Sequence, residues 1–288
     1  MRYRRRSPLF AWAFLAPSLA LFAIFFAYPL VACFWLSLHR WDMLADPQWV
    51  GAANYAALLA PGSELGPVIG RTIVYSAGTV VGSVALGLAL ALALHRVGRV
   101  GHVLRSAIFA SYVVSWVGVS LLWSYLLDDQ LGPLSALLEA AGLGAPDWLG
   151  DPDWALVSLV GVSIWKVVGY DMVLYLAALE DIPREILEAA RLDGAGRWAT
   201  FRTIVWPLLG PTTLFLVVTG TLMSFQGFDV VRVMTGGGPA GATQIWVHWL
   251  YEQAFAYFRL GPACAAVTLF FVPLALVTWL GRFGWQHA

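Results

Sequence analysis

Charged residues are scarce in this chain. Only 12% of its 288 residues are Asp, Glu, Lys or Arg, whereas 60% are hydrophobic. Soluble globular domains carry about 25% charged residues, so the composition excludes an ordinary soluble protein and predicts an integral membrane protein. The formal net charge is zero, which gives no indication of a nucleic-acid partner.

Cysteine and lysine are scarcer still, and each scarcity excludes a kind of site. The two cysteines, Cys33 and Cys264, lie in apolar runs without a CxxC or Cys/His cluster, which argues against a disulfide framework and a metal site. The only lysine, Lys166, lies between Trp165 and Val167. A phosphate-binding P-loop needs Gly-Lys-Ser/Thr, so we expect no ATPase site here. If ATP drives this protein, another subunit binds it.

A rhomboid-like intramembrane serine protease is an alternative for a chain of this size. Such an enzyme needs a serine in a GxSG motif and a histidine in another span. The nearest string is GVSI at residues 161–164, which lacks the final glycine. The histidines, at positions 39, 95, 102, 248 and 287, fall in loops or at the ends of apolar segments. We therefore expect a protein that is not an enzyme and has no catalytic residues.

Six apolar segments are long enough to cross a bilayer as helices, at residues 9–38, 72–94, 106–127, 154–179, 208–230 and 260–280. The first follows the basic start MRYRRRSP but is about twice as long as the apolar part of a signal peptide. We expect a transmembrane helix there, kinked at Pro17 and Pro29. The second is rich in Gly and Ala, which lets helices pack closely.

These segments divide the chain into two regions. Residues 1–71 contain a basic tail, the first transmembrane helix and an outer loop, and residues 72–288 contain a core of five transmembrane helices. The N-terminus, residues 95–105, residues 180–207 and the C-terminal tail hold four, three, four and one arginines, whereas the opposing connections hold two, none and two. Because positively charged loops stay in the cytoplasm, we expect both termini and residues 180–207 to be cytoplasmic.

Polar residues in the fourth span are candidates for a solute pathway. Asp171 offers a carboxylate to sugar hydroxyls, and Tyr170 offers an aromatic surface; alternatively, Asp171 hydrogen-bonds a neighbouring helix. Lys166 is five residues before Asp171, so the two side chains point about 140° apart on a helix and are poorly placed to pair. We expect Lys166 to extend toward a membrane interface.

The fifth span carries a second polar cluster. Ser224, Gln226 and Asp229 alternate with two phenylalanines, and they either contact solute or hydrogen-bond neighbouring helices. No arginine lies deep in any span, whereas a site for a free phosphate or sulfate would favour one. The two clusters therefore favour a neutral, hydroxyl-rich solute, with Lys166 or Arg232 available to a phosphate ester.

The most informative stretch is PREILEAARLDGAGRWATFRTIVWP, residues 183–207. Apolar residues recur at helical spacing between 186 and 192, which predicts a short amphipathic helix, and Gly194 is a helix-ending residue. A second short helix, residues 197–205, is expected to end before Pro207. The stretch is either a docking surface at the membrane face or an ordinary connecting loop.

This stretch resembles the EAA signature of permease subunits of binding-protein-dependent ABC importers. The family pattern is met by Glu188-Ala189-Ala190, Gly194, Ile204 and Pro207 at the required spacings, with Trp206 where leucine is usual. In that family the first helix is the coupling helix, which docks on the ATP-hydrolysing subunit. The resemblance implies that the docking residues here are Glu185, Ile186, Leu187, Glu188, Ala189, Ala190, Asp193 and Gly194.

The resemblance extends over nearly the whole chain, to carbohydrate and glycerol-phosphate importers of the maltose type. It is carried by APSL (16–19), YPL (28–30), WVGAANY (49–55), WKVVGYDM (165–172), TGGGPAGAT (235–243) and YEQAF (251–255). It implies an all-α integral membrane protein of about six transmembrane helices with the type I ABC importer permease fold. It also implies a solute pathway lined by Tyr170, Asp171, Ser224, Gln226 and Gly227.

The resemblance further implies a set of partners. These are a second permease forming a heterodimer, two ATP-binding subunits that bind ATP and Mg, and an extracytoplasmic solute-binding protein. The binding protein would contact Gly236, Gly237, Gly238 and Pro239, which otherwise form a plain turn.

The implied function is uptake of a di- or oligosaccharide across the cell (inner or plasma) membrane of a prokaryote. The alternative solute is glycerol-3-phosphate or a glycerophosphodiester. Importers of other solute classes share the docking motif but often lack the TGGGP and YEQAF strings.

Overall fold

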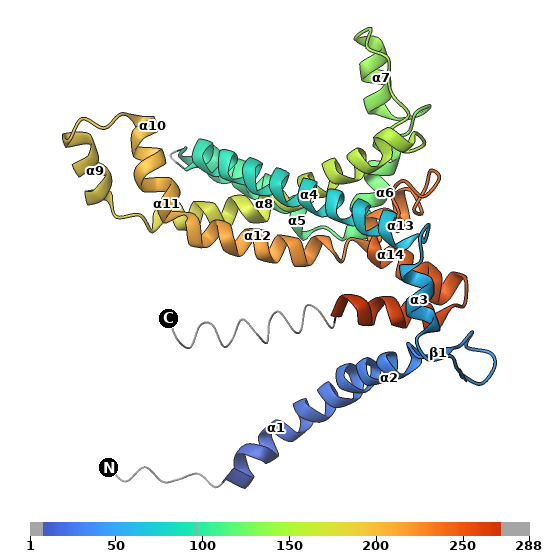
Figure 1. The fold of residues 1–288 in the computed structure, drawn as a ribbon. Coiled ribbons are helices and arrows are strands. Elements are labelled where there is room, and N and C mark those ends of the chain that lie inside the picture. Colours follow the sequence, from blue (N-terminus) through green and yellow to red (C-terminus); the bar gives the residue numbers. More distant parts are fainter. Residues whose placement is uncertain (1–7, 96, 272–288) are drawn as a thin grey trace. The chain divides into compact units, whose positions relative to one another are not determined.

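The computed structural model describes residues 8–95 and 97–271 (Figure 1). Its regular structure is almost entirely helical, which confirms the all-α prediction. Within the described ranges, the strands are limited to one antiparallel pair, β1 (His39–Arg40) and β2 (Gln48–Trp49). The chain divides into two compact units, one formed by Met1–Leu65 with Leu250–Ala288 and the other by Gly66–Trp249.

The first unit contains the predicted first span. Its elements are α1 (Pro8–Phe22), the π-helical turn η1 (Ala23–Ala27), α2 (Tyr28–Leu36), the strand pair, α3 (Ala53–Leu59), the π-helical turn η3 (Glu252–Ala256) and a last apolar helix, Leu260–Phe271. Residues Phe14–Leu36 form one apolar helix long enough to cross a membrane, as predicted. The predicted sixth span is helical up to Phe271, and the rest of it lies outside the described residues.

The WVGAANY string has a structural role in this unit. Asn54 is buried, and its side-chain amide donates to the carbonyls of Ser37 (2.8 Å) and His39 (2.9 Å). The backbone N–H of Leu260 donates to the carbonyl of Trp41 at 3.1 Å. These bonds join the end of α2, the start of α3 and the last apolar helix.

The second unit holds the remaining helices. They are α4 (Leu65–Leu94), α5 (Arg99–Val113), α6 (Trp116–Leu126), α7 (Pro133–Ala140), α8 (Pro152–Glu180), α9 (Arg184–Leu192), α10 (Arg197–Thr200), the π-helical turn η2 (Phe201–Val205), α11 (Trp206–Leu208), α12 (Gly210–Ser224), α13 (Phe228–Met234) and α14 (Trp246–Tyr251). Helices α4 and α8 are continuous and long enough to span a membrane, which confirms two further predicted spans.

The third and fifth predicted spans are not continuous helices. Within the third, the chain bends by 102° between α5 and α6, and at the start of the fifth it bends by 59° between α11 and α12. At the first break Val114 and Ser115 adopt extended backbone conformations, with ψ of 145° and 140°. The fifth predicted span also ends early, because α12 stops at Ser224 and α13 begins at Phe228. Hydropathy alone does not detect such breaks, because the broken segments stay apolar.

Two prolines in the long helices each follow a π-helical turn, whereas Pro17 lies within α1. Pro29 follows η1 and Pro207 follows η2, each by two residues. A proline within a helix lacks an N–H and its ring crowds the carbonyl four residues earlier, and a π-helical turn relieves that conflict locally. The expectation that the second short helix would stop before Pro207 was wrong, because the helix continues to Leu208.

Glycines on α4 allow α8 to pack closely against it. A Cβ atom on Gly78 would lie 3.1 Å from Val160, and one on Gly87 would lie 2.7 Å from the Cβ atom of Asp171. On the other side of α8, a Cβ atom on Gly169 would lie 2.5 Å from the Ile108 carbonyl oxygen of α5. The prediction that small residues in the second span permit close helix packing is therefore confirmed.

Two apolar clusters lie along α8, one toward each of its ends. The first contains Leu159 and Val162 of α8 with residues of α4, α6 and α13. The second contains Met172, Tyr175, Leu176 and Leu179 of α8 with residues of α4 and α12. The middle of α8 belongs to neither cluster of buried residues, and it is there that polar side chains gather.

Candidate functional site

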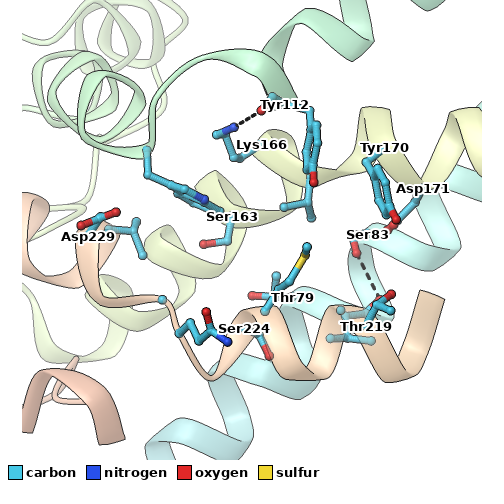
Figure 2. A pocket seen from close by; sticks show the side chains of 18 of the residues that line it. Thr79, Ser83, Tyr112, Ser163, Lys166, Tyr170, Asp171, Thr219, Ser224 and Asp229 are labelled. Atoms are coloured by element: carbon cyan, nitrogen blue, oxygen red, sulfur yellow. Dashed lines mark hydrogen bonds between the residues drawn. The ribbon is translucent and has the colours of Figure 1, made fainter. Parts of the chain in front are cut away.

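A cavity of about 510 Å³ occupies the middle of the second unit, between the two apolar clusters. It is bounded by α4, the α5–α6 break, α8, α12 and the start of α13. Polar and aromatic side chains dominate its wall (Figure 2), and they include Tyr75, Thr79, Ser83, Tyr112, Ser115, Trp116, Ser163, Lys166, Tyr170, Asp171, Thr219, Ser224, Gln226 and Asp229. The predicted pathway residues Tyr170, Asp171, Ser224, Gln226 and Gly227 all lie on this wall.

Helix α4 contributes a row of hydroxyl groups that the sequence analysis missed. Tyr75, Thr79 and Ser83 line the cavity, and the Tyr75 hydroxyl is hydrogen-bonded to the Ser163 hydroxyl of α8 at 2.7 Å. These residues recur every four positions, so they share one face of the helix. That spacing was the available signal, but the surrounding Gly and Ala residues were interpreted only as packing surface.

Asp171 lies at the crossing of α8 with α4. Its side chain is 6% exposed, and its polar neighbour is the Ser83 hydroxyl of α4 (Figure 2). The adjacent Tyr170 ring stacks on the Tyr112 ring at the end of α5, with 4.9 Å between their centroids. A carboxylate beside a stacked aromatic pair can bind the hydroxyl edge and the apolar face of one polyol.

Lys166 does not extend toward a membrane interface, so that expectation was wrong. It is 2% exposed, and its ammonium group donates to the Tyr112 carbonyl at 2.5 Å. The same nitrogen lies 5.2 Å from the ring centroids of both Tyr112 and Trp116. No ion pair joins Lys166 to Asp171 or to another carboxylate among the described residues, which agrees with the predicted 140° separation.

The break between α12 and α13 brings the second predicted cluster to the cavity. The Ser224 hydroxyl is hydrogen-bonded to that of Ser76 on α4 at 2.5 Å, so the structure includes the predicted inter-helical bond. A Cβ atom on Gly227 would lie 2.8 Å from the Tyr75 hydroxyl oxygen. Any larger residue at position 227 would require the backbone or the Tyr75 side chain to move.

The constellation needed by a serine protease is missing from this region. Ser163 is bonded to Tyr75, and no histidine is among the residues lining the cavity. Within the described ranges, no three His, Cys, Asp or Glu side chains converge as metal ligands would. The hydroxyl, carboxylate and aromatic groups on the cavity wall are of the kinds that bind a polar solute.

The predicted amphipathic helix is α9, which spans Arg184–Leu192. Its end has the expected glycine geometry: Gly194 has φ of +77°, and the N–H groups of Gly194 and Ala195 donate to the carbonyls of Arg191 and Ala190, which is a Schellman motif. Leu187 packs against the apolar cluster around Leu209, and Ala190 is buried.

The other predicted docking residues of α9 are on its outer side. Glu185, Ile186, Glu188 and Ala189 are exposed, as are Asp193 and Gly194 beyond the helix. Arg184 and Arg191 of the same helix are also exposed. The helix thus presents apolar groups and charges of both signs on a surface that the rest of the described chain leaves uncovered.

The TGGGP segment forms an ordered turn at the start of α4. Gly236 and Gly237 have φ of +60° and +88°, and the Thr243 hydroxyl donates to the Gly238 carbonyl at 2.7 Å. The N–H of Trp246 donates to the Thr72 hydroxyl at 2.8 Å. The turn and α9 therefore lie at opposite ends of α4, since α9 packs in the cluster that contains Leu94.

Bent membrane helices thus surround a polar cavity, with an exposed helix at one end of α4 and a glycine turn at the other, an arrangement expected of a solute permease. Residues 83–283 match the family of binding-protein-dependent transport system inner membrane components, and the chain belongs to this family. Because that match covers most of the chain, the resemblance drawn from the EAA signature is confirmed.

Curated relatives match over almost their full length. The chain is 35% identical to the sn-glycerol-3-phosphate transport system permease protein UgpA of Agrobacterium fabrum, over 93% of this chain and 92% of the relative. It is 30% identical to the trehalose/maltose transport system permease protein MalF of Thermococcus litoralis, over 90% of this chain and 87% of the relative.

Among solved structures, the fold is similar to a chain in the crystal structure of a bacterial ABC transporter involved in the import of the acidic polysaccharide alginate. The TM-score is 0.80 at 24% identity, and the match covers 97% of this chain and 95% of that one. This likeness confirms the predicted permease fold.

Proposed function

We propose that this chain is the permease subunit of an ATP-driven importer that takes up a di- or oligosaccharide. The observation that carries the proposal is the cavity, where the Asp171 carboxylate, several hydroxyls and the stacked rings of Tyr112 and Tyr170 surround about 510 Å³. Ligand sites for small molecules occupy roughly 300–1,000 Å³. Trehalose and maltose in the name of one relative support a sugar.

The alternative solute is glycerol-3-phosphate or a related diester. The name of the Agrobacterium relative supports it, and Lys166 on the cavity wall is a cation that a phosphate could approach. Asp171 and Asp229 line the same cavity, however, and their negative charges would oppose an anionic solute. We therefore favour a neutral sugar.

The proposal includes the partners of such an importer. They are a second permease, two ATP-binding subunits that hold ATP and Mg, and an extracytoplasmic binding protein that contacts the turn at Gly236–Pro239. The exposed side of α9 supports docking to an ATP-binding subunit. The last partner is supported by a bacterial alginate ABC transporter of similar fold, which was crystallised in complex with a periplasmic protein. The complex would lie in the inner or plasma membrane of a prokaryote.

The test begins with co-purification of the complex from its source in mild detergent. A second permease and a P-loop ATPase are the expected companions, and purification of the chain alone would contradict the importer. The complex with its binding protein is then placed in liposomes, and ATP hydrolysis is measured with maltose, trehalose or glycerol-3-phosphate. Stimulation by either sugar supports the main proposal, whereas stimulation by glycerol-3-phosphate alone replaces it with the alternative.

A further inference from the structure

The α5–α6 break leaves a polar group that a continuous helix would satisfy. In an uninterrupted helix the Tyr112 carbonyl would accept a hydrogen bond from the N–H of Trp116. The extended conformations of Val114 and Ser115 turn the chain by 102° before α6 begins at Trp116. The carbonyl end of α5 also carries a partial negative charge from its aligned peptide dipoles, so it needs a donor and favours a cation.

Lys166 of the neighbouring helix α8 supplies both the hydrogen-bond donor and the positive charge. Its ammonium donates to the Tyr112 carbonyl at 2.5 Å and contacts an aromatic ring on each side of the break, Tyr112 before it and Trp116 after it. The two cation–π contacts and the charged hydrogen bond all strengthen in a water-poor environment. One α8 side chain thus holds both halves of the bent segment.

Other contacts fix α5 to the same part of α8. The Ser111 hydroxyl lies 3.1 Å from the Trp165 carbonyl oxygen, and Gly169 allows the backbone of α8 to touch that of α5 at Ile108. Tyr112 in turn carries the ring that stacks on Tyr170. Because Lys166 holds Tyr112 in place, it also fixes the aromatic wall of the cavity beside Asp171.

From these contacts we propose that Lys166 is a positioning residue that fixes the α5–α6 break and thereby the cavity wall. Its positive charge compensates the partial negative charge at the carboxyl end of α5. It does not serve to bind an anionic solute. The inference rests on the proposed function only in treating the cavity as the solute pathway. Its structural test needs no solute, so its failure is distinguishable from failure of the proposed function.

The test measures the bend directly by pulsed electron resonance on the assembled complex in nanodiscs. Spin labels are attached to Val103→Cys on α5 and Leu121→Cys on α6, both exposed positions, in a complex otherwise free of cysteine. We expect one narrow distance for the native Lys166. Lys166→Met should shift or broaden it, and Lys166→Arg should preserve it, because Arg also donates to carbonyls and stacks on rings.

A reference pair separates loss of the bend from loss of the fold. Labels at Val103 and at Val157, an exposed residue of α8, should keep their distance in every variant. If Lys166→Met fails to assemble, Trp116→Leu, which keeps the lysine but removes one ring, should still broaden the Val103–Leu121 distance. An unchanged Val103–Leu121 distance in either variant would overturn the proposal.

Transport provides the second readout, using whichever of maltose, trehalose or glycerol-3-phosphate stimulates ATP hydrolysis. We expect Lys166→Met to lose most of the stimulated rate and Lys166→Arg to regain most of it. A rise in the half-saturating solute concentration with the maximal rate and the label distance unchanged would make Lys166 a direct solute ligand, and would also overturn the proposal.

Discussion

Gly87 of α4 and Asp171 of α8 lie so close that a Cβ atom on the glycine would be 2.7 Å from the Cβ atom of the aspartate. Backbone atoms of Asp171 and Met172 lie at 3.2 and 3.1 Å from the same point, so a longer side chain could not be accommodated by a rotamer change alone. The absence of a side chain at Gly87 thus sets the position of the carboxylate on the cavity wall.

The first prediction follows from this contact. Gly87→Ala should force α4 and α8 apart, at a cost of about 1–3 kcal/mol for overpacking, and should lower the apparent affinity for solute. Gly70→Ala is the matched control on the same helix, because a Cβ atom there meets nothing within 4 Å. The measurement is thermal unfolding together with solute-stimulated ATP hydrolysis. Equal behaviour of the two variants would contradict the assigned packing.

The second prediction concerns Asp171 itself. Asp171→Ala and Asp171→Asn should raise the solute concentration needed for half-maximal ATP hydrolysis by about tenfold, because a hydrogen bond to a charged group contributes roughly 1.5–3 kcal/mol. Asp153→Asn, in the exposed first turn of α8, is the control. If the concentration dependence of Asp171→Ala matches that of the native protein, Asp171 does not contact the solute.

The third prediction concerns the turn after α9. Gly194 has φ of +77°, a conformation that costs residues other than Gly, Asn and Asp about 1–2 kcal/mol and is least compatible with a β-branched side chain, so Gly194→Val should misplace the helix end and reduce uptake while the protein still inserts. Gly196→Ala is the control, since Gly196 has an ordinary negative φ and open space around it. Unchanged uptake by Gly194→Val would remove the docking role of this turn.

The fourth prediction concerns the exposed Glu188 of α9. Glu188→Lys should weaken association with the ATP-binding subunit and uncouple ATP hydrolysis from uptake, because it reverses a charge at the proposed interface. Glu139→Lys makes the same charge change on exposed α7 and should leave coupling intact. The ratio of solute taken up to ATP hydrolysed is the quantity to compare, and equal ratios in both variants would count against the interface.

The fifth prediction concerns the first unit. Asn54→Ala removes the donor from the buried carbonyls of Ser37 and His39 and should destabilise the protein by about 1–3 kcal/mol. Tyr55→Phe removes a single bond, to the Ser37 hydroxyl at 2.6 Å, and should have a smaller effect. Thermal denaturation of the purified complex distinguishes them, and a larger loss from Tyr55→Phe would contradict the assigned role of Asn54.

The parts of this fold that could be predicted from sequence depend on local signals. The helix α9 follows from apolar spacing that ends at Gly194, and α4 and α8 follow from long apolar runs. Asp171 stood out because a charge in an apolar segment is costly. In each case the informative residues lie within a few turns of one another.

The parts that could not be predicted depend on contacts between distant segments. The break at Val114 and Ser115 contains neither proline nor glycine, and it is supported by Lys166, more than fifty residues away. The orientation of Lys166 depends on the same contact, so the sequence alone favoured a membrane interface. The hydroxyls of α4 became part of a site only once α8 and α12 were seen to face them.

Lys166 is the only lysine of the chain, and its burial in the middle of α8 has a practical consequence for following how the protein unfolds. A protease that cuts only after lysine has one site here, which divides the chain into residues 1–166 and 167–288. That bond becomes accessible only when α8 opens. The appearance of these two fragments therefore reports the openings, local or global, that expose this one bond of α8.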